Sequence, residues 1–318
     1  MPAISANAPA KAILVGEHAV VYNQPAIAFP INTVHAQTTI FANPLGSPNE
    51  IQLIAADINL NANLASLPPN NPFVIALNGF MKVANISSFP ACKIMLKSSI
   101  PIASGLGSSA ATSISFIRAL ANFIGFPMDN QLISDLAFQV EVQYHGTPSG
   151  IDNTVIAHNQ IIYFIKAQPY KIIHPVKPLT IVIANSGIKG NTKEAVRQVR
   201  QFWLTQKARA ESIFLQIGEI SRNAEASINQ GDEILLGQLL NANHELLRQL
   251  NVSHPKLEDL IEQALQNGAY GAKLCGGGLG GNMIALVPSE SAEKVADALT
   301  TAGATLTFIE VLKAGING

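Results

Sequence analysis

The chain changes its hydrophobic period sharply across one loop of small residues, and this switch constrains the fold more than any other feature. Cys92–Lys97 alternates apolar and polar side chains, which is typical of a strand with one buried face. Pro101 follows this strand, and Gly105–Phe126 then places apolar side chains at helical spacing. The sequence therefore predicts a strand, a tight loop and a helix in direct succession.

The loop between this strand and helix has the composition of a phosphate-binding loop. Residues 101–111 are Pro-Ile-Ala-Ser-Gly-Leu-Gly-Ser-Ser-Ala-Ala. Small residues leave backbone N–H groups unshielded, and the start of the helix adds its unpaired N–H groups and positive dipole end. The loop is not a GxxxxGK[ST] phosphate loop, and Ala110 stands where a dinucleotide GxGxxG fingerprint needs its third glycine. Taken alone, it also fits an ordinary strand–helix turn capped by serine.

Strands and helices are distributed unevenly along the chain. Short strands are expected at 12–15, 34–41, 51–55 and 161–165, and helices dominate the second half, so the predicted fold class is α+β. Three prolines punctuate 167–178, where we expect a domain boundary. The predicted domains are 1–176 and 177–318, and a return of the final strand to the first domain is left open.

Composition excludes several classes of protein. The 318 residues are 48% hydrophobic and 13% charged, with 20 basic against 21 acidic residues, so there is no basic excess of the kind a nucleic-acid binder shows. The two cysteines form no CxxC pair, which favours a reducing compartment. We find neither a secretory signal nor an apolar run of membrane-spanning length. A cytoplasmic enzyme without a membrane or nucleic-acid partner is expected.

Two carboxylates flank a second turn-rich segment, His145-Gly-Thr-Pro-Ser-Gly-Ile-Asp-Asn. Glu141 lies near the end of the predicted helix 129–145, and Asp152 follows the Gly-Thr-Pro-Ser-Gly turn. Phosphoryl transfer uses one carboxylate to hold Mg²⁺ and gains from another that accepts the proton of the acceptor hydroxyl. A solvated helix-end glutamate and a turn aspartate would explain the same residues, so this segment alone decides nothing.

Two further segments combine glycine with polar side chains. Residues 273–281 are Lys-Leu-Cys-Gly-Gly-Gly-Leu-Gly-Gly, and so many glycines are costly to order unless a backbone must approach something closely. Near the N-terminus, a predicted strand leads from Lys11 to Gly16, Glu17 and His18. A flexible hairpin and a surface lysine are the ordinary explanations of these two segments.

Together, these segments resemble the galactokinase–homoserine kinase–mevalonate kinase–phosphomevalonate kinase (GHMP kinase) superfamily, and its mevalonate kinase branch most closely. The resembling segments are 9–22, 101–111, 145–153, 188–193 and 273–281, in the order typical of the family and over nearly the whole chain. The resemblance implies an N-terminal domain like that of ribosomal protein S5 and a C-terminal ferredoxin-like domain. It also implies an ATP- and Mg²⁺-dependent kinase with mevalonate as its small-molecule substrate, and it keeps a homodimer as a hypothesis.

The resemblance assigns a role to each matching residue. Asp152 would be the general base, with Lys11 favouring its ionised form and stabilising the developing alkoxide. Glu141 would bind Mg²⁺ with help from either Ser108 or Ser109, between which the sequence does not decide. Residues implied for the phosphates of ATP are Gly105, Leu106, Gly107, Ser108, Ser109 and Ala110. Residues implied for the acceptor are Glu17, His18, Gly150 and Asp152, and the glycine-rich loop contributes Gly276, Gly277 and Gly278.

The third motif departs from the family pattern at two positions. Cys275 stands where the family usually has threonine, and a thiol is a weaker hydrogen-bond donor than a hydroxyl. Leu279 stands where the family usually has glycine. These departures leave two alternatives open: another kinase of the superfamily, acting on phosphomevalonate, homoserine or a sugar, and a non-catalytic protein that keeps the fold.

Overall fold

The computed structural model describes residues 3–101, 105–145 and 148–315. Residues 102–104 of the first loop and 146–147 of the second segment lie outside the described residues. By packing, the chain divides into two compact units. The first unit comprises 1–11, 30–101 and 107–159, and the second comprises 12–29, 102–106 and 160–318. The division at residues 176 and 177 stays a prediction.

A mixed sheet forms the backbone of the first unit. Four neighbouring strands of this seven-stranded sheet run in the order β4 (Leu60–Asn63), β3 (Ile51–Ala55), β5 (Cys92–Ser98) and β2 (Ala26–Ala42). The predicted strand β5 lies parallel to β3 and antiparallel to β2, with Ile94 opposite both Leu53 and Ile40. These three side chains are fully buried, as the alternating pattern predicted.

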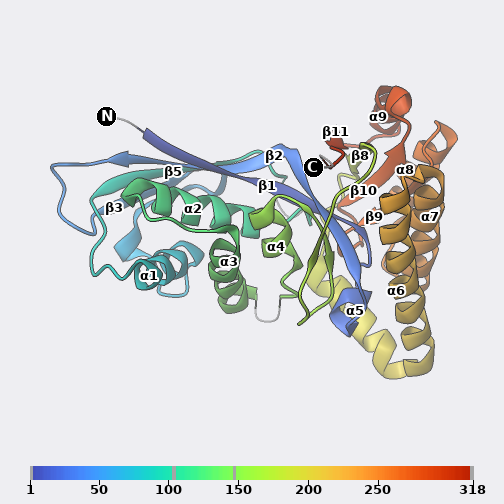
Figure 1. Cartoon of the computed structure of the whole chain (residues 1–318), viewed down its shortest axis with the longest axis horizontal. Coiled ribbons are helices and arrows are strands. Elements are labelled where there is room, and N and C mark those ends of the chain that lie inside the picture. The colour runs from blue at the N-terminus through green and yellow to red at the C-terminus, as the bar shows by residue number, and fades with distance from the viewer. Residues whose placement is uncertain (1–2, 102–104, 146–147, 316–318) are drawn as a thin grey trace. The chain divides into compact units, whose positions relative to one another are not determined.

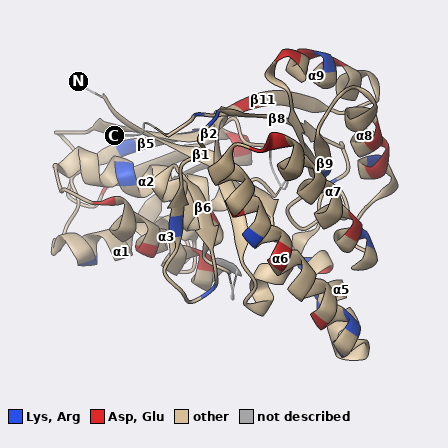
Figure 2. Cartoon of the chain, turned by 45° about the vertical axis from the view of Figure 1, so that its right-hand side comes forward, with Lys and Arg blue, Asp and Glu red and all other residues tan. Residues whose placement is uncertain are grey.

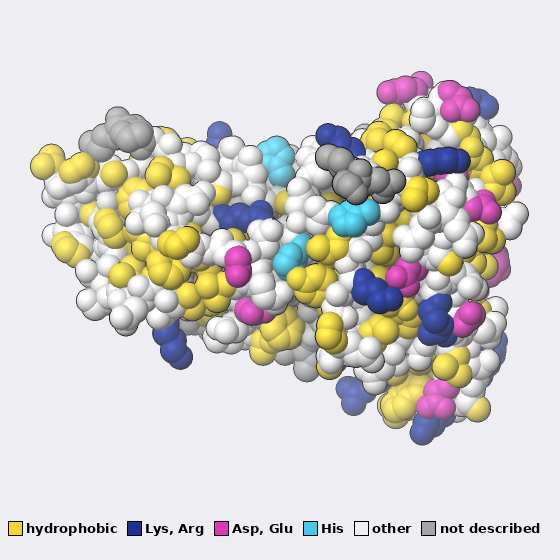
Figure 3. Space-filling model, in the orientation of Figure 1, with side chains coloured by type: hydrophobic (Ala, Val, Ile, Leu, Met, Phe, Trp, Pro, Cys, Tyr) yellow, Lys and Arg dark blue, Asp and Glu magenta, His cyan; other side chains and the backbone are white. Residues whose placement is uncertain are grey.

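Helices cover one face of this sheet (Figure 1). They are α1 (Pro72–Ala84), α2 (Ser108–Ile124), α3 (Asn130–His145) and α4 (Ile151–His158). Helix α2 packs on β5 and on the other three helices, and its apolar face is fully buried around Ile114 and Ile117. Asp129 caps α3 as predicted, because its carboxylate accepts the Leu132 N–H at 2.7 Å. On the face seen in Figure 3, uncharged side chains cover most of α1 and α3.

The second unit contains a four-stranded antiparallel sheet. Its order is β11 (Leu306–Leu312), β8 (Leu179–Asn185), β10 (Asn282–Val287) and β9 (Gly271–Cys275). With α8 (Pro255–Gln266) before β9 and α9 (Ala292–Thr301) before β11, the chain follows the β-α-β-β-α-β path of a ferredoxin-like fold. The final strand therefore pairs with β8, inside this sheet.

Three long helices are inserted between β8 and α8. They are α5 (Thr192–Thr205), α6 (Lys207–Gln230) and α7 (Glu233–Gln249), and Asp232 caps α7 as predicted by accepting the Leu235 N–H at 2.9 Å. Helix α7 lies unusually close to β9, because a Cβ on Gly271 would meet the Gly237 carbonyl oxygen at 1.9 Å. Acidic and basic side chains both occur along α5 and α6 (Figure 2), and Glu194–Arg197 and Glu219–Arg222 form ion pairs three residues apart.

Several elements differ from the sequence predictions. Strands β1 (Ala3–Val15) and β2 are much longer than the predicted segments 12–15 and 34–41. Outside those segments, alanines and polar residues occupy many positions, so the alternation of large apolar and polar side chains that predicts a strand is weak there. Helices α1 and α4 were not predicted, and neither were the short strands β4 and β7 (Lys171–Ile173); β6 (Ile161–Phe164) was predicted. Within the described residues, no helix is both long and apolar enough to cross a membrane.

Candidate active site

An ion pair joins Lys11 and Asp152 in the first unit. Lys11 lies in β1, Asp152 lies in the first turn of α4, and Nζ is 3.0 Å from Oδ1. The lysine side chain is 5% exposed and the aspartate side chain 38%. Gly150, with φ of +91°, makes the turn that starts α4, and the first turn of a helix favours a negative side chain. The pair thus combines a buried cation with a carboxylate that solvent reaches.

A second carboxylate in the same unit is held by a serine. The Ser109 hydroxyl donates to Glu141 Oε1 at 2.5 Å, joining the first turn of α2 to the last turn of α3. Glu141 is buried and Ser109 half-buried. A carboxylate and a hydroxyl supply only hard oxygen ligands, which suit Mg²⁺. Ser108 precedes Ser109 in the same turn and is also half-buried.

The start of α2 has the features of a phosphate cradle. Gly107 precedes the helix with φ of +73°, and a Cβ there would approach Lys11 Cγ to 2.9 Å. The N–H groups of Ser108, Ser109 and Ala110 fall in the first turn, where an α-helix offers them no carbonyl acceptor. Gly107, at the start of α2, therefore lies close to Lys11.

Two other residues of the predicted phosphate loop, Gly105 and Leu106, are grouped with the second unit. Gly105 has φ of +80°, and a Cβ on it would meet no atom within 4 Å. Leu106, by contrast, is almost fully buried. Among the described residues, nothing therefore crowds Gly105, whereas Leu106 is enclosed.

The second unit contains another lysine–carboxylate pair, between Lys273 of β9 and Glu17. Both side chains are sealed from solvent, with exposures of 0% and 1%, and Lys273 Nζ donates to Glu17 Oε1. Nζ also donates to the Leu274 carbonyl at 2.7 Å. Burial raises the pKa of the Glu17 carboxyl, and the Lys273 charge opposes part of that rise. Sequence reasoning assigned no role to Lys273, although a lysine inside the apolar strand β9 is unusual.

His18 is held in the turn after Glu17. Its Nε2 lies 3.0 Å from the Gly277 carbonyl, so this nitrogen carries the proton and donates. Burial lowers the pKa of His18 to about 4, with the nearby Lys273 charge acting in the same direction. The ring is therefore neutral at physiological pH, and Nδ1 is its hydrogen-bond acceptor.

The glycine-rich loop packs tightly against its own unit. A Cβ on Gly278 would meet the Val252 carbonyl oxygen at 2.0 Å, and one on Gly277 would meet Thr192 Cα at 2.9 Å. Gly276 faces Gly105, whose carbonyl oxygen would be 3.6 Å away from an added Cβ. Only Gly276 thus borders the predicted phosphate loop, while the other two glycines are required by packing.

The two departures in this motif have structural consequences. Leu279 adopts a φ of +58°, a left-handed conformation that favours glycine and strains a branched side chain. Its N–H donates to the Val252 carbonyl at 2.7 Å. The Cys275 thiol lies 3.6 Å from the Ile13 carbonyl oxygen, so it serves as a weak donor to the backbone of β1.

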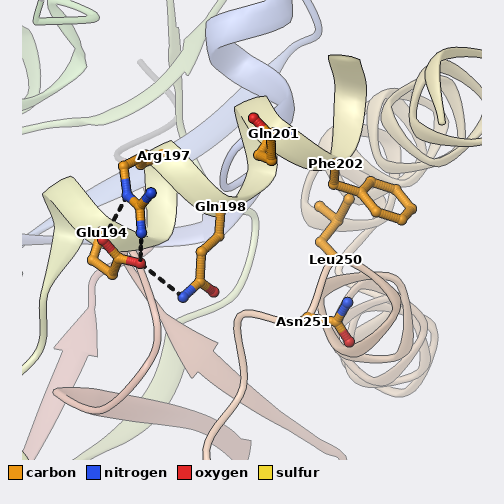
Figure 4. A pocket seen from close by; sticks show the side chains of 7 residues that line it. All are labelled: Glu194, Arg197, Gln198, Gln201, Phe202, Leu250 and Asn251. Carbon is orange, nitrogen blue, oxygen red and sulfur yellow. Dashed lines mark hydrogen bonds and ion pairs between the residues drawn. The ribbon is translucent and has the colours of Figure 1, made fainter. Parts of the chain in front are cut away.

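A separate hollow of about 270 Å³ lies beside α5 and contains none of the predicted site residues (Figure 4). Its walls are the polar face of α5, where Glu194 binds Arg197 and Gln198, and the end of α7. The lining residues are Glu194, Arg197, Gln198, Gln201, Phe202, Leu250 and Asn251.

Comparison with known proteins identifies the family. Residues 72–159 match the model of the GHMP kinases N terminal domain, and residues 224–305 match that of the GHMP kinases C terminal. The chain is also 35% identical to a mevalonate kinase of Thermococcus gammatolerans, over 98% of this chain and 97% of that one. The chain belongs to the GHMP kinase family. This GHMP kinase is accordingly an ATP-dependent small-molecule kinase.

Solved structures extend the similarity to the whole fold. The GHMP kinase is similar to the mevalonate kinase of Methanococcus jannaschii, with a TM-score of 0.85, 28% identity and coverage of 99% of each chain. It is also similar to the L. major mevalonate kinase in complex with R-mevalonate, with a TM-score of 0.83, 27% identity and coverage of 98% and 96%. The predicted two-domain α+β fold is confirmed.

Proposed function

We propose that this GHMP kinase transfers the γ-phosphoryl group of ATP to the C5 hydroxyl of mevalonate, giving 5-phosphomevalonate and ADP. The observation that carries the chemistry is the 3.0 Å ion pair of Lys11 and Asp152, beside the half-buried start of α2 at Gly107. The full-length similarity to mevalonate kinases supports the choice of acceptor.

In this proposal, the chain's own groups move one proton and stabilise charge. Asp152 takes the proton of the acceptor hydroxyl, whose oxygen forms a bond to the γ-phosphorus as the bond to the bridging oxygen of ADP breaks. Lys11, whose Nζ lies 3.0 Å from Asp152 Oδ1, stabilises the negative charge that develops on the attacking oxygen. The first-turn N–H groups of Ser108, Ser109 and Ala110 bind phosphate oxygens, next to Gly105 and Gly107.

We infer that Ser109, rather than Ser108, assists Glu141 in holding Mg²⁺. The hydrogen bond of 2.5 Å places the Ser109 hydroxyl against the Glu141 carboxylate, so one ion can be bound by both. Glu141 and Ser109 would hold the ion, and bound Mg²⁺ would supply positive charge that neutralises the phosphate groups.

The acceptor contacts are proposed for Glu17, His18 and Gly150. Because His18 is neutral and its Nε2–H donates to the Gly277 carbonyl, Nδ1 is the ring nitrogen left for a ligand, and it accepts a hydrogen bond. We therefore infer that His18 meets a hydroxyl of mevalonate rather than its carboxylate. A homodimer and a cytoplasmic location also stay predictions.

A coupled ADP-release assay tests the proposal. Purified protein, ATP and Mg²⁺ are combined with mevalonate, phosphomevalonate, homoserine or galactose, with and without EDTA. We expect turnover with mevalonate alone, abolished by EDTA. Turnover with a different acceptor would replace the substrate but keep the mechanism, and bound ATP without any turnover would favour a non-catalytic protein.

A further inference from the structure

The turn that carries Glu17 and His18 is strained. The Ala19 N–H donates to the Glu17 carbonyl at 2.6 Å, which closes a three-residue γ-turn centred on His18. His18 has φ of 61° and ψ of −46°, a combination that is rare for a residue with a side chain. Such strain persists only where the surrounding structure holds it, and it gathers at functional sites.

Three contacts within the second unit hold this turn. The Gly16 N–H donates to Asn243 Oδ1 of α7 at 3.1 Å, and His18 donates to the Gly277 carbonyl at 3.0 Å. Between them, Glu17 is bound by Lys273 of β9. The close packing of α7 on β9 at Gly237 and Gly271 brings the two supporting elements together.

The ion pair of Lys273 and Glu17 adds little to the stability of the fold. Removing two charges from water costs about as much as their attraction returns, and apolar side chains of similar volume would stabilise the fold at least as well. Lys273 and Glu17 are both sealed, so solvent does not reduce this cost. The pair is therefore better explained by the geometry that it imposes than by stability.

Glu17 also has an unused acceptor. Its Oε2 is buried and makes no hydrogen bond with any residue that the structure describes. A buried carboxylate oxygen without a donor is costly, and a hydroxyl of a bound molecule would satisfy it. The lysine binds one oxygen of Glu17 and leaves the other for a ligand.

We propose that Lys273 is a positioning residue that acts through Glu17, holding the strained turn at His18 in the form that binds the acceptor. The inference rests on the proposed function in one respect: it takes Glu17 and His18 as acceptor-binding residues. Lys273 itself touches no reacting atom in this scheme.

The test is a comparison of Michaelis constants. K273M removes the ammonium and keeps the length of the side chain. K256M is the matched control, because Lys256 donates to the Ala302 carbonyl in the same unit. We expect K273M to raise the KM for mevalonate about tenfold or more and to change the KM for ATP by less than about twofold, with K256M changing neither. A purely structural role would lower the fraction of folded enzyme, which scales the rate but leaves KM unchanged.

A double-mutant cycle shows whether Lys273 acts through Glu17. In the E17Q background, K273M should change the KM for mevalonate by less than about threefold, because the ion pair is already lost. E17Q/K273M buries no uncompensated charge, so its comparison with E17Q decides the question even if K273M does not fold. An equal effect of K273M in both backgrounds, a large further rise in E17Q/K273M, or an unchanged KM in folded K273M would overturn the proposal.

Failure of the proposed function would give a different result. If the wild-type enzyme phosphorylates another acceptor from the panel, the same variants are measured with that acceptor. A rise in its KM in K273M would then support the positioning role while the assignment of mevalonate is abandoned.

Discussion

Each unit of this GHMP kinase contains a lysine–carboxylate pair whose lysine is buried, and these two pairs differ in the exposure of the carboxylate. Asp152 is 38% exposed beside the buried Lys11, whereas Glu17 and Lys273 are both sealed. A carboxylate that exchanges a proton with a substrate has to be reached by that substrate. A carboxylate that exchanges no proton with the substrate can be enclosed, and its partner lysine with it.

The difference in exposure also predicts which pair affects the reaction rate and which affects folding stability. Water can solvate Asp152 if its partner is removed, so the Lys11 pair contributes little to folding. Water cannot solvate Glu17 in this way because the side chain is buried, and the charge that stabilises its ionised form is that of Lys273. We therefore expect variants of the first pair to lose rate and variants of the second to lose stability and acceptor affinity.

The largest effect is expected for D152N. Loss of the general base should lower kcat by about 10²–10⁴-fold, up to about 5 kcal/mol in the barrier, and leave ATP binding nearly intact. The matched control is D135N, since Asp135 is an exposed aspartate of α3 in the same unit. Steady-state kinetics and nucleotide titration measure both. Near-normal turnover in D152N would show that Asp152 is not the base.

The second-largest effect is expected in the folding stability of the two lysine variants, K273M and K11M. K273M leaves a buried carboxylate without its partner and should lower the free energy of unfolding by about 3–5 kcal/mol, and E17Q/K273M should recover most of this loss. K11M should cost about 1 kcal/mol or less. Urea denaturation compares the proteins. Equal losses in K11M and K273M would remove the distinction between the pairs.

A pH effect is expected from His18. Its pKa is lowered to about 4 in the folded protein, whereas the unfolded chain takes up the proton near the ordinary histidine pKa of 6.5. The unfolded state therefore binds more protons between these values, and stability should fall as the pH is lowered from about 6.5 to 4, by at most about 3 kcal/mol.

The variant H18Q isolates this effect. Glu17, whose folded pKa is raised, favours the folded state at low pH and acts in the opposite direction, but it is present in both proteins. Urea denaturation at stepped pH should therefore give a flatter profile for H18Q than for the wild type. Identical slopes would mean that His18 does not titrate with folding.

The smallest predicted effect separates the two serines. S109A removes the hydroxyl that binds Glu141 and should raise the Mg²⁺ concentration needed for half-maximal activity about tenfold, or about 1.4 kcal/mol. S108A serves as the matched control and should change it by less than about threefold. A Mg²⁺ titration at saturating ATP measures both, and the reverse order would transfer the metal role to Ser108.

Local signals made much of the fold predictable. Asp129 and Asp232 are capping residues whose effect extends over a few positions, and both helices begin where the sequence indicated. Helix α1 also has such a signal, since Asn71 accepts the Phe73 N–H and Pro72 occupies its first turn. Its apolar residues are too continuous to show a helical period, so it was missed.

The site could be predicted only in part. Helix α4 is eight residues long and rich in β-branched side chains, so the sequence did not predict the helix that carries Asp152. The choice of Ser109 beside Glu141 depends on how α2 and α3 pack. Lys273 and Glu17 are 256 positions apart, and no local pattern indicates that they form a pair.

The most direct test of the separation between the two pairs is a mevalonate titration of K11M and K273M, side by side with the wild type at saturating ATP. The account predicts that K11M lowers kcat with little change in KM, because Lys11 stabilises charge in the transition state. It predicts that K273M raises KM, because the turn at His18 is no longer held. If both variants lowered kcat equally and kept the wild-type KM, the two lysines would share one role and the account would be wrong.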